Sequence, residues 1–284
     1  MENKICVITG ATAGIGKAAA LALAGKGARV VLVSRNEAKG QRVKREIIQQ
    51  TGNERIDFFR ADLSLLKEVR RVAGEIQRKI DRIDVLLNNA GAFFNNKILT
   101  EEGFEKTFAL NHLNYFLLTR ELLGLLKEAP AGRIVNVASD AHQGVEIDFD
   151  NLNGEKEYSG WKAYQRSKLA NIMFTYHLAE EIKGTKLTAN CLHPGFVKTS
   201  FGNNNRGLVG FGLRLAKALA AIRISKGADT SIYLASSPEV EGVSGRYFVK
   251  RKPARSSKAS YDITAIQRLW EISEEMVAAT PGKG

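Results

Sequence analysis

Short apolar runs without polar alternation recur along this chain, and longer segments with helical periodicity separate them. Such runs are typical of strands buried on both faces, and the segments between them are long enough for crossover helices. About seven strands are expected, at residues 4–9, 29–34, 56–61, 85–88, 133–138, 187–192 and 247–249. Helices are expected at residues 15–26, 37–50, 65–80, 101–128, 164–182 and 226–235.

This alternation predicts the α/β class, with a doubly wound parallel sheet of the Rossmann type and helices on both of its faces. No linker, low-complexity segment or internal repeat interrupts the pattern, and 44% of the 284 residues are hydrophobic, which is sufficient for one large core. We therefore predict a single domain over residues 1–284. In such a sheet ligands bind beyond the carboxyl ends of the strands, so functional residues are expected directly after strands.

We expect neither a targeting signal nor a membrane-spanning segment in this chain. No apolar stretch approaches the ~20 residues that a membrane-spanning helix needs, and the first strand begins too early to leave room for a signal peptide. Cytoplasmic residence without a transmembrane segment is therefore expected.

The two cysteines, Cys6 and Cys191, lie inside apolar runs and lack the spacing of metal ligands. They are expected to be buried thiols, with no disulfide and no metal site.

The formal net charge of +12 fits a polyanionic partner or a phosphate-rich cofactor. The basic residues, however, fall into separate stretches at residues 39–45, 70–82 and 250–258. The first two stretches are mixed with acidic residues, as on a solvated helix face. The favoured interpretation is an ordinary charged surface, and no nucleic-acid partner is predicted.

A glycine-rich turn follows the first expected strand and opens directly into a helical segment, with the sequence Thr9-Gly-Ala-Thr-Ala-Gly-Ile-Gly16. Gly10 permits a tight turn, Gly14 lets the backbone approach a pyrophosphate, and Gly16 allows close packing of the helix on the strand. The spacing departs from the common G-x-G-x-x-G pattern, so the inference rests on strand, turn and helix occurring together. Cofactor contacts are predicted for Gly10, Thr12, Gly14, Ile15 and Gly16, with the helix N-terminus facing the phosphates.

The end of the second expected strand reads Ser34-Arg35-Asn36. An NAD-specific site carries an acidic residue here, about 20 residues after the glycine turn, to bind the ribose 2′-hydroxyl. Arg35 instead suits the 2′-phosphate of NADP(H), with Ser34 as a further donor and Asn36 beside it. NADP(H) is therefore favoured over NAD(H). The alternative for Arg35 is an exposed arginine at the start of a helix.

Two further strand ends carry candidate cofactor residues. Asp62-Leu63 follows the third strand, where Asp62 either accepts a hydrogen bond from the adenine amino group or caps a helix that starts at Ser64. The sequence Asn-Asn-Ala-Gly at residues 88–91 follows the fourth strand. Its small residues let the backbone run beside a cofactor, and its asparagine amides can tie neighbouring loops together. The residues predicted to line the cofactor site are Asn89, Ala90 and Gly91.

Three side chains form a candidate catalytic group. Ser139 follows the fifth strand, and Tyr164 and Lys168 share one helix face at i and i+4. A phenol with a pKa near ~10 is a poor acid or base at neutral pH unless a cation favours its phenolate, and Lys168 together with a positively charged nicotinamide would supply that charge. In reduction, Tyr164 would protonate the carbonyl oxygen while Ser139 hydrogen-bonds to it.

With these motifs in this order, the chain resembles the short-chain dehydrogenase/reductase family along essentially its full length. The resemblance is carried by Thr9-Gly-x-x-x-Gly-Ile-Gly16, Asp62-Leu63, Asn88-Asn-Ala-Gly91, Asn111, Ser139, Tyr164-x-x-x-Lys168 and Pro194-Gly195. Residues 151–155, 163–171 and 269–270 resemble the retinol-dehydrogenase-like branch, which is typically NADP(H)-linked. His193 stands where the wider family has Asn and fits this branch.

The resemblance implies a catalytic tetrad of Asn111, Ser139, Tyr164 and Lys168. In it, Asn111 organises a water-linked proton relay through Lys168, and Lys168 also holds the nicotinamide ribose. The residues implied to lie against the nicotinamide carboxamide are Pro194, Gly195, Val197 and Thr199. A homodimer or tetramer is expected on the same ground.

Substrate selection is expected to fall to the segments that the sheet constrains least, above all a substrate loop or lid at about residues 196–222. Aromatic residues there and in two earlier loops would line an apolar pocket or belong to the core: Phe93, Phe94, Phe149, Trp161, Phe196, Phe201 and Phe211. A lipophilic carbonyl compound or alcohol, retinal among them, is the expected substrate. The basic amphipathic run at 213–222 either closes this pocket or touches a membrane.

The sequence therefore predicts an oxidoreductase that uses NADP(H) to interconvert a carbonyl compound and its alcohol. The competing interpretation is a catalytically idle dinucleotide-binding regulator or scaffold. Such a protein can lose the tyrosine or the lysine, whereas this chain retains Ser139, Tyr164 and Lys168. The enzyme is therefore the favoured interpretation.

Overall fold

The structure, a computed structural model, describes residues 1–195 and 224–279. Its strands form one sheet in the order β3-β2-β1-β4-β5-β6-β7-β8. The strands are β1 (Ile5–Thr9), β2 (Arg29–Ser34), β3 (Ile56–Arg60), β4 (Val85–Asn88), β5 (Gly132–Val137), β6 (Leu187–His193), β7 (Arg246–Val249) and β8 (Lys252–Ala254). The pairs from β3 through to β7 are all parallel, which confirms the predicted α/β fold.

The edge strand β8 corrects the expected number of strands and makes the sheet mixed. It pairs antiparallel with β7 across a two-residue turn, in which Lys250 and Arg251 have φ values of 49° and 65°. β8 is only three residues long, contains Pro253 and is exposed throughout. It therefore lacks the apolar run by which a strand is predicted. Lys252 and Pro253 protect the sheet edge against pairing with another chain.

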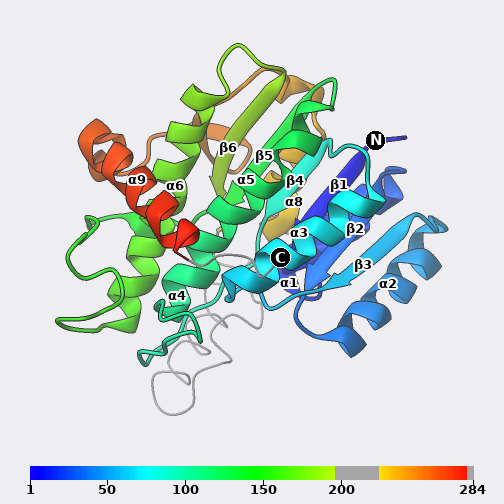
Figure 1. Cartoon of the computed structure of the whole chain (residues 1–284). Helices are drawn as coiled ribbons and strands as arrows, with labels where there is room; N and C mark the ends of the chain where they lie inside the picture. The colour runs from blue at the N-terminus through cyan, green and yellow to red at the C-terminus, as the bar shows by residue number, and fades with distance from the viewer. Residues whose placement is uncertain (196–223, 280–284) are drawn as a thin grey trace.

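Helices cover both faces of the sheet (Figure 1). One core lies between the strands and α1 (Gly14–Gly25), α2 (Glu37–Thr51) and α8 (Ile224–Ser236). The other lies between the strands and α3 (Leu66–Lys79), α5 (Asn114–Lys127), α6 (Gly160–Glu181) and α9 (Ile263–Ala278). Along β2, Val31 and Val33 belong to one core, and Val30 and Leu32 belong to the other. The strands are thus buried on both faces, as predicted.

The helix expected at residues 101–128 begins later and is interrupted. Glu105 accepts hydrogen bonds from the N–H groups of Thr107 and Phe108, so the helix starts after it. From there the chain runs through α4 (Lys106–Phe108), a π-helical turn (Ala109–Leu113) and α5. α6 also departs from expectation: it begins at Gly160, ahead of Tyr164, because the side chain of Ser159 accepts from the backbone of its first turn.

The expected helices do not include α9, which lies against the outer side of α6 (Figure 1). Its Trp270 stacks on Phe174 and His177 of α6, with ring centres 5.8 Å and 4.1 Å away. The aromatic face of α6 is therefore covered by the C-terminal part of the same chain.

The order of the strands brings the predicted site residues to one edge. From β1 the chain moves outward to β2 and β3, then returns to the other side of β1 at β4, so the order reverses between β1 and β4. The parallel strands place the segments after β1, β4, β5 and β6 at the same carboxyl edge. That edge is where a doubly wound sheet binds its ligand.

Across residues 1–195 and 224–279, no helix is long and apolar enough to cross a bilayer. Cys6 and Cys191 are both buried and free, which confirms that prediction. Burial raises the pKa of each thiol to about 12, so neither is a thiolate at neutral pH.

Candidate active site

The glycine turn after β1 is shaped by its contact with the loop after β4. Gly10 has a φ of 64°, and a Cβ there would lie 2.9 Å from the Cα of Ala90. A Cβ on Gly16 would lie 2.6 Å from the carbonyl oxygen of Gly10. A side chain at either position would therefore force the turn away from its neighbours, which confirms the tight turn and the close packing predicted for these glycines. Gly14, with a φ of 54°, begins α1.

Hydrogen bonds join the turn after β1 to the loop after β4. The Thr9 hydroxyl accepts from the N–H groups of Asn89 and Ala90, at 2.8 and 2.9 Å. The Asn89 side-chain amide donates to the carbonyl oxygen of Thr9 at 2.8 Å. The structure thus confirms that the asparagine ties these two loops together.

No side chain of the described residues caps the N-terminus of α1. Ala13 precedes the helix without a side-chain cap, and the first turn has no acidic residue. By contrast, α2, α6 and α9 each begin at a side chain that accepts a backbone hydrogen bond. Thr12 and Ile15 lie on either side of this N-terminus at partly buried positions. Such donors beside a glycine turn fit the phosphates of a dinucleotide.

The residues predicted to bind the 2′-phosphate lie at the carboxyl end of β2. The Ser34 hydroxyl is buried and has no hydrogen-bond partner among the described residues. Arg35 is exposed, and its guanidinium makes no ion pair within the described ranges. Asn36 accepts from the Lys39 N–H at 2.8 Å and so caps α2. Arg60, which the sequence pattern did not single out, pairs with Ser34 in the register of β2 and β3 and brings a second arginine to this edge.

Asp62 caps no helix, which corrects one of its two predicted roles. Its carboxylate accepts from the N–H and the hydroxyl of Ser64, at 3.0 and 2.7 Å, whereas α3 begins only at Leu66. The first two N–H groups of α3 donate instead to the carboxylate of Glu102, at 2.8 Å each. Leu63 is buried in the core beneath α3. A loop distant in sequence therefore supplies the cap.

Ser139, Tyr164 and Lys168 converge beyond the carboxyl end of β5. Tyr164 and Lys168 share the buried face of α6, and the Lys168 Nζ lies 5.7 Å from the centre of the Tyr164 ring. The Ser139 hydroxyl lies close enough to the Tyr164 phenol to lower its pKa, and it accepts from the Ala141 N–H at 3.2 Å. The Ser139 proton is then available for donation toward Tyr164 or toward a substrate oxygen.

Burial shifts the pKa of both residues on α6. It raises the pKa of Tyr164 to about 12, and the nearby Ser139 hydroxyl opposes that rise. It lowers the pKa of Lys168 to about 7. Burial thus works against the phenolate and ammonium pair that the i and i+4 spacing predicts. Lys168 is held in place because its Nζ donates to the Val137 carbonyl oxygen at 3.0 Å.

Asn111 lies fully buried in the π-helical turn, a widened turn of the kind often found at functional sites. Its side-chain oxygen accepts from the Ala92 N–H at 2.9 Å, and its amide donates to the Ala92 carbonyl and the Ser167 hydroxyl, at 3.0 and 2.9 Å. A Cβ on Gly91 would lie 3.2 Å from Asn111 Oδ1 and 3.4 Å from Lys168 Nζ. The structure therefore brings these three residues together, with the Asn111 side chain engaged in holding the loop after β4.

A buried line of polar side chains, which the sequence pattern did not predict, fixes α6 over the strands. Asn88 of β4 donates to the Asn136 side chain of β5 at 2.9 Å. Asn136 donates to the Thr175 hydroxyl at 2.9 Å, and Thr175 donates to the Asn171 carbonyl oxygen at 2.7 Å. These buried hydrogen bonds hold the helix that carries Tyr164 at a set position on the sheet. In the sequence, these hydrogen bonds could be anticipated only from the asparagines that interrupt the apolar strand runs.

Tyr115 is a further residue of the site that the sequence pattern did not reveal. It is fully buried, and its phenol donates at 3.5 Å to the Val137 carbonyl oxygen, the same atom that accepts from Lys168. The Lys168 Nζ lies 5.8 Å from the centre of its ring. Tyr115 thus forms the wall against which Lys168 is packed.

Pro194 and Gly195 follow β6 directly, and Gly195 has a φ of 79°. Because β6 pairs with β5, they lie at the same edge as Ser139. Several predicted residues lie outside the described part of the chain, together with the whole predicted lid at 196–222: Phe196, Val197, Thr199, Phe201 and Phe211.

Two of the aromatic residues predicted for the substrate pocket flank Tyr164. The Phe93 ring meets it edge to face at 6.2 Å, and Trp161, which is 48% exposed, stacks on it at 5.8 Å. Phe149 lies elsewhere, with its ring 4.5 Å from the Arg268 guanidinium of α9. The structure therefore brings Phe93 and Trp161 to the catalytic group and leaves Phe149 apart.

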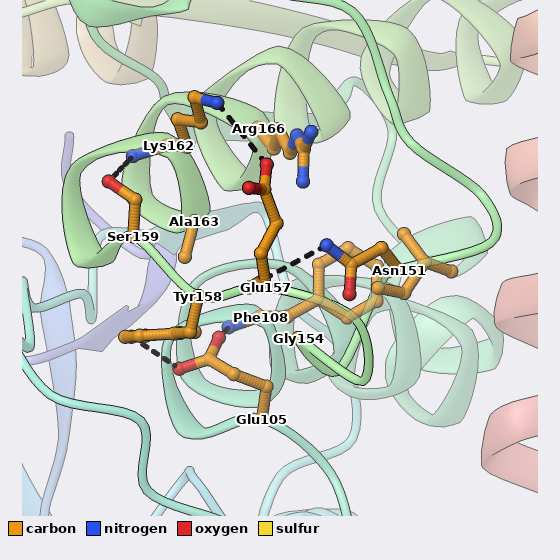
Figure 2. Close-up of a pocket in the computed structure, with 11 residues that line it drawn as sticks. Glu105, Phe108, Asn151, Gly154, Glu157, Tyr158, Ser159, Lys162, Ala163 and Arg166 are labelled. Atoms are coloured by element: carbon orange, nitrogen blue, oxygen red, sulfur yellow. Dashed lines mark hydrogen bonds and ion pairs between the residues drawn. The ribbon is translucent and has the colours of Figure 1, made fainter.

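A small pocket lies beside the first turns of α6 (Figure 2). Its polar groups bind one another: Tyr158 donates to Glu105 at 3.1 Å, and the Asn151 amide donates to the Glu157 carbonyl at 3.0 Å. The residues that line it include none of the catalytic group. We assign this cavity to the packing of the loop before α6 and not to the reaction centre.

The sequence of this chain matches a known protein family. A family model described as short chain dehydrogenase matches residues 4–210, the part of the chain that holds the glycine turn, Ser139, Tyr164 and Lys168. This chain belongs to the short-chain dehydrogenase family. It is accordingly an oxidoreductase that acts on an alcohol or carbonyl group.

Curated relatives narrow the assignment within the family. Human retinol dehydrogenase 14 is 42% identical over 98% of this chain and 87% of its own length. Human polyprenol dehydrogenase is 37% identical over 96% of this chain and 85% of its own length. With retinol dehydrogenases 11 to 13 also among the similar proteins, the chain falls in the retinol-dehydrogenase-like branch, as its motifs predicted.

Solved short-chain dehydrogenases have the same fold. The crystal structure of an uncharacterized protein from Mycobacterium paratuberculosis matches 98% of this chain and 94% of its own, with a TM-score of 0.79 and 31% identity. A short chain dehydrogenase from Escherichia coli CFT073, complexed with NADPH, matches 89% of this chain and 98% of its own, with a TM-score of 0.69 and 25% identity.

Proposed function

We propose that this chain is an NADP(H)-dependent oxidoreductase that interconverts a lipophilic aldehyde or ketone and its alcohol. The observation that carries the proposal is the convergence of three side chains: Ser139 lies close enough to the Tyr164 phenol to lower its pKa, and the Lys168 Nζ lies 5.7 Å from the centre of the Tyr164 ring. This group lies at the sheet edge where the glycine turn and α1 offer backbone donors. The arrangement fits general acid–base chemistry beside a bound dinucleotide.

In the reduction direction, Tyr164 donates its phenol proton to the carbonyl oxygen while the Ser139 hydroxyl hydrogen-bonds to the same oxygen. When bound, the nicotinamide cofactor supplies the hydride and, in its oxidised form, adds a positive charge beside Tyr164. Because burial lowers the pKa of Lys168 to about 7, this residue can return a proton toward Tyr164 at neutral pH. In oxidation the same side chains act in reverse.

The preference for NADP(H) rests on the carboxyl ends of β2 and β3. Arg35 has no ion pair within the described ranges, Arg60 pairs with Ser34 in the sheet register, and the buried Ser34 hydroxyl has no partner among the described residues. A phosphate could bind all three donors through charge-assisted hydrogen bonds. Two solved short chain dehydrogenases of this fold are complexed with NADP and NADPH, which supports the same choice.

The lipophilic substrate rests on the aromatic surroundings of Tyr164. Phe93 and Trp161 present two ring systems beside the phenol, and the exposed part of Trp161 offers an apolar surface to a ligand at this edge. The names of the curated relatives, retinol and polyprenol dehydrogenases, point to long apolar alcohols. Retinal and long-chain aldehydes are therefore the first substrates to test.

The deciding experiment follows the oxidation of NADPH and of NADH with short and long-chain aldehydes, ketones and retinal. We expect faster loss of NADPH, and a fall of ~100- to 10,000-fold in kcat for Tyr164→Phe, because this change removes the acid group. The control is Tyr233→Phe, which removes an exposed phenol on α8 that donates to Glu239 at 2.9 Å and should keep wild-type activity. NADPH binding by the wild type without turnover of any substrate would instead favour a regulatory dinucleotide-binding protein.

A second substitution tests the cofactor preference. Arg35→Gln should raise the KM for NADPH by roughly tenfold or more and leave the KM for NADH unchanged, because only NADPH has a phosphate for the guanidinium to bind. Arg42→Gln, at an exposed position on α2, is the matched control and should change neither value. Equal effects of Arg35→Gln on both cofactors would contradict the assigned role.

A further inference from the structure

Two histidines hold the turn that carries Ser139, and the first of them is His142. This residue is fully buried, with its Nδ1 2.6 Å from the Ser139 carbonyl oxygen. Its Nε2 accepts from the Ser257 N–H at 3.0 Å. A backbone N–H can only donate, so Nε2 carries no proton. The proton of the neutral ring therefore lies on Nδ1 and is donated to the carbonyl oxygen of Ser139.

The second histidine is His193, the last residue of β6. Its Nδ1 accepts from the Asp140 N–H at 3.1 Å. The bond requires that Nδ1 be unprotonated, so neutral His193 carries its proton on Nε2. The last backbone bond between β5 and β6 joins the Ala138 N–H to the Leu192 carbonyl at 2.9 Å. The His193 side chain thus extends this ladder by one step beyond the point where the two strands separate.

The two bonds reach opposite sides of a single peptide group. The carbonyl of Ser139 and the N–H of Asp140 belong to the same planar unit, which His142 holds at its oxygen and His193 at its nitrogen. The orientation of that plane sets the backbone of Ser139 and therefore the direction of its hydroxyl. His193 also precedes Pro194 directly, so it links the serine turn to the segment predicted to contact the nicotinamide.

We propose that His142 and His193 are positioning residues that clamp the Ser139–Asp140 peptide, and so hold the Ser139 hydroxyl against Tyr164, only while both imidazoles are neutral. The proposal rests on the proposed function in assigning Ser139 a role in turnover. A cationic His193 would direct an N–H at the N–H of Asp140, and a cationic His142 would direct one at the N–H of Ser257. Either charge breaks the clamp.

The charged and titratable groups around His142 and His193 determine the pH at which either ring gains a proton and the clamp breaks. Among the described residues, Asp140 and His142 face His193, whereas Asp140 and the Tyr247 ring, 5.2 Å away, face His142. Burial lowers the pKa of both histidines. The hydrogen bond to the Ser139 carbonyl and the negative charge of Asp140 only partly offset this for His142, and the charge of Asp140 only partly offsets it for His193. Both rings are therefore neutral at pH 7, and the clamp is lost as the pH falls below the ordinary histidine value of ~6.5.

The test compares His193→Asn with His193→Leu. The asparagine side-chain oxygen can accept from the Asp140 N–H but does not titrate, whereas leucine can neither accept nor titrate. We expect kcat to fall by roughly 10- to 100-fold in His193→Leu and to stay within about threefold of wild type in His193→Asn. The loss of kcat on acidification should become weaker in His193→Asn, because one of the two titrating groups is gone. Equal damage by both changes, or wild-type kcat in His193→Leu, overturns the proposal.

A readout without substrate separates this proposal from the proposed function. The chain has 4 histidines, so their ring ¹⁵N signals can be assigned by substitution. We expect His142 protonated on Nδ1 and His193 on Nε2 at pH 7, and we expect the exchange of the Asp140 amide to quicken in His193→Leu but not in His193→Asn. With these results, an absence of carbonyl turnover would reject the proposed function and leave the clamp standing. The opposite tautomers in an active enzyme would reject the clamp alone.

Discussion

At the scale of single residues, the reaction centre places a cation where burial disfavours charge. Lys168 is 4% exposed, and its pKa is lowered to about 7 by the loss of contact with water. Its hydrogen bond to the Val137 carbonyl and the ring of Tyr115 hold it in place but bring no negative charge. A residue kept in such a position for chemistry is expected to cost stability.

Lys168→Met should therefore abolish turnover and stabilise the fold at neutral pH, by roughly 1–3 kcal/mol. The unfolded chain holds the lysine proton up to its ordinary pKa near 10.5, whereas the folded chain releases it near 7. Wild-type stability from this group thus rises as the pH increases from about 7 to about 10.5, and the advantage of the variant should shrink over that range. Urea unfolding at pH 6.5 and 9.5 measures both effects. Lys162→Met, at an exposed position of α6, should show neither effect, and a pH-independent advantage of Lys168→Met would contradict the assignment.

At the scale of elements, helices near the site are held by residues from distant parts of the chain. α3 has no cap of its own at Leu65, and the Glu102 carboxylate binds its first two N–H groups. The π-helical turn before α5 is tied to the loop after β4 by Asn111 and to α9 by a hydrogen bond between His112 and Ser273 at 2.9 Å. The loops around the reaction centre thus also supply hydrogen bonds that the ends of nearby helices lack.

Glu102→Ala should lower the free energy of unfolding by about 1 kcal/mol, because two N–H groups of α3 lose their acceptor. The matched control is Glu101→Ala, which removes only an exposed ion pair with Lys67 and should cost about 0.5 kcal/mol or less. Chemical denaturation measures the free energy of unfolding of both variants, and Glu102→Ala should show the larger loss. A cost for Glu101→Ala that equals the cost for Glu102→Ala would show that the capping bonds contribute nothing beyond surface charge.

At the scale of the whole molecule, the reversal of strand order between β1 and β4 assembles the proposed cofactor site. The glycine turn follows β1, Arg35 follows β2, and Asn89 follows β4, so their proximity exists only in the folded sheet. A dinucleotide that contacts all of these segments must bind the native state in preference to the unfolded chain.

NADPH should consequently raise the stability of the whole protein. At a free concentration of 100 times its Kd, the gain is about 2.7 kcal/mol. Thermal unfolding across a concentration series measures it, and NADH should need a higher concentration for the same shift. Gly16→Val is the control, since its side chain would meet the carbonyl oxygen of Gly10 and distort the turn. Identical shifts in this variant and in the wild type would place the cofactor elsewhere.

Local sequence patterns were enough to predict the α/β class, the parallel strands β1 to β7, and the strand ends that carry Gly10, Arg35, Asn89 and Ser139. Each of these follows from local patterns: apolar runs, helical periodicity and turn residues act over a few neighbouring positions. The i and i+4 spacing likewise placed Tyr164 and Lys168 on one helix face, and the fold buries that face.

The distant groups that complete this framework are brought together by the tertiary fold. The antiparallel edge strand β8, the docking of α9 on α6, the cap that Glu102 provides for α3 and the two histidines around the Ser139–Asp140 peptide all depend on long-range contacts. The same holds for the pKa of Lys168, because burial is a property of the packed molecule. Hydrogen-bond partners and desolvation depend on separation in space, and local sequence patterns carry no record of that separation.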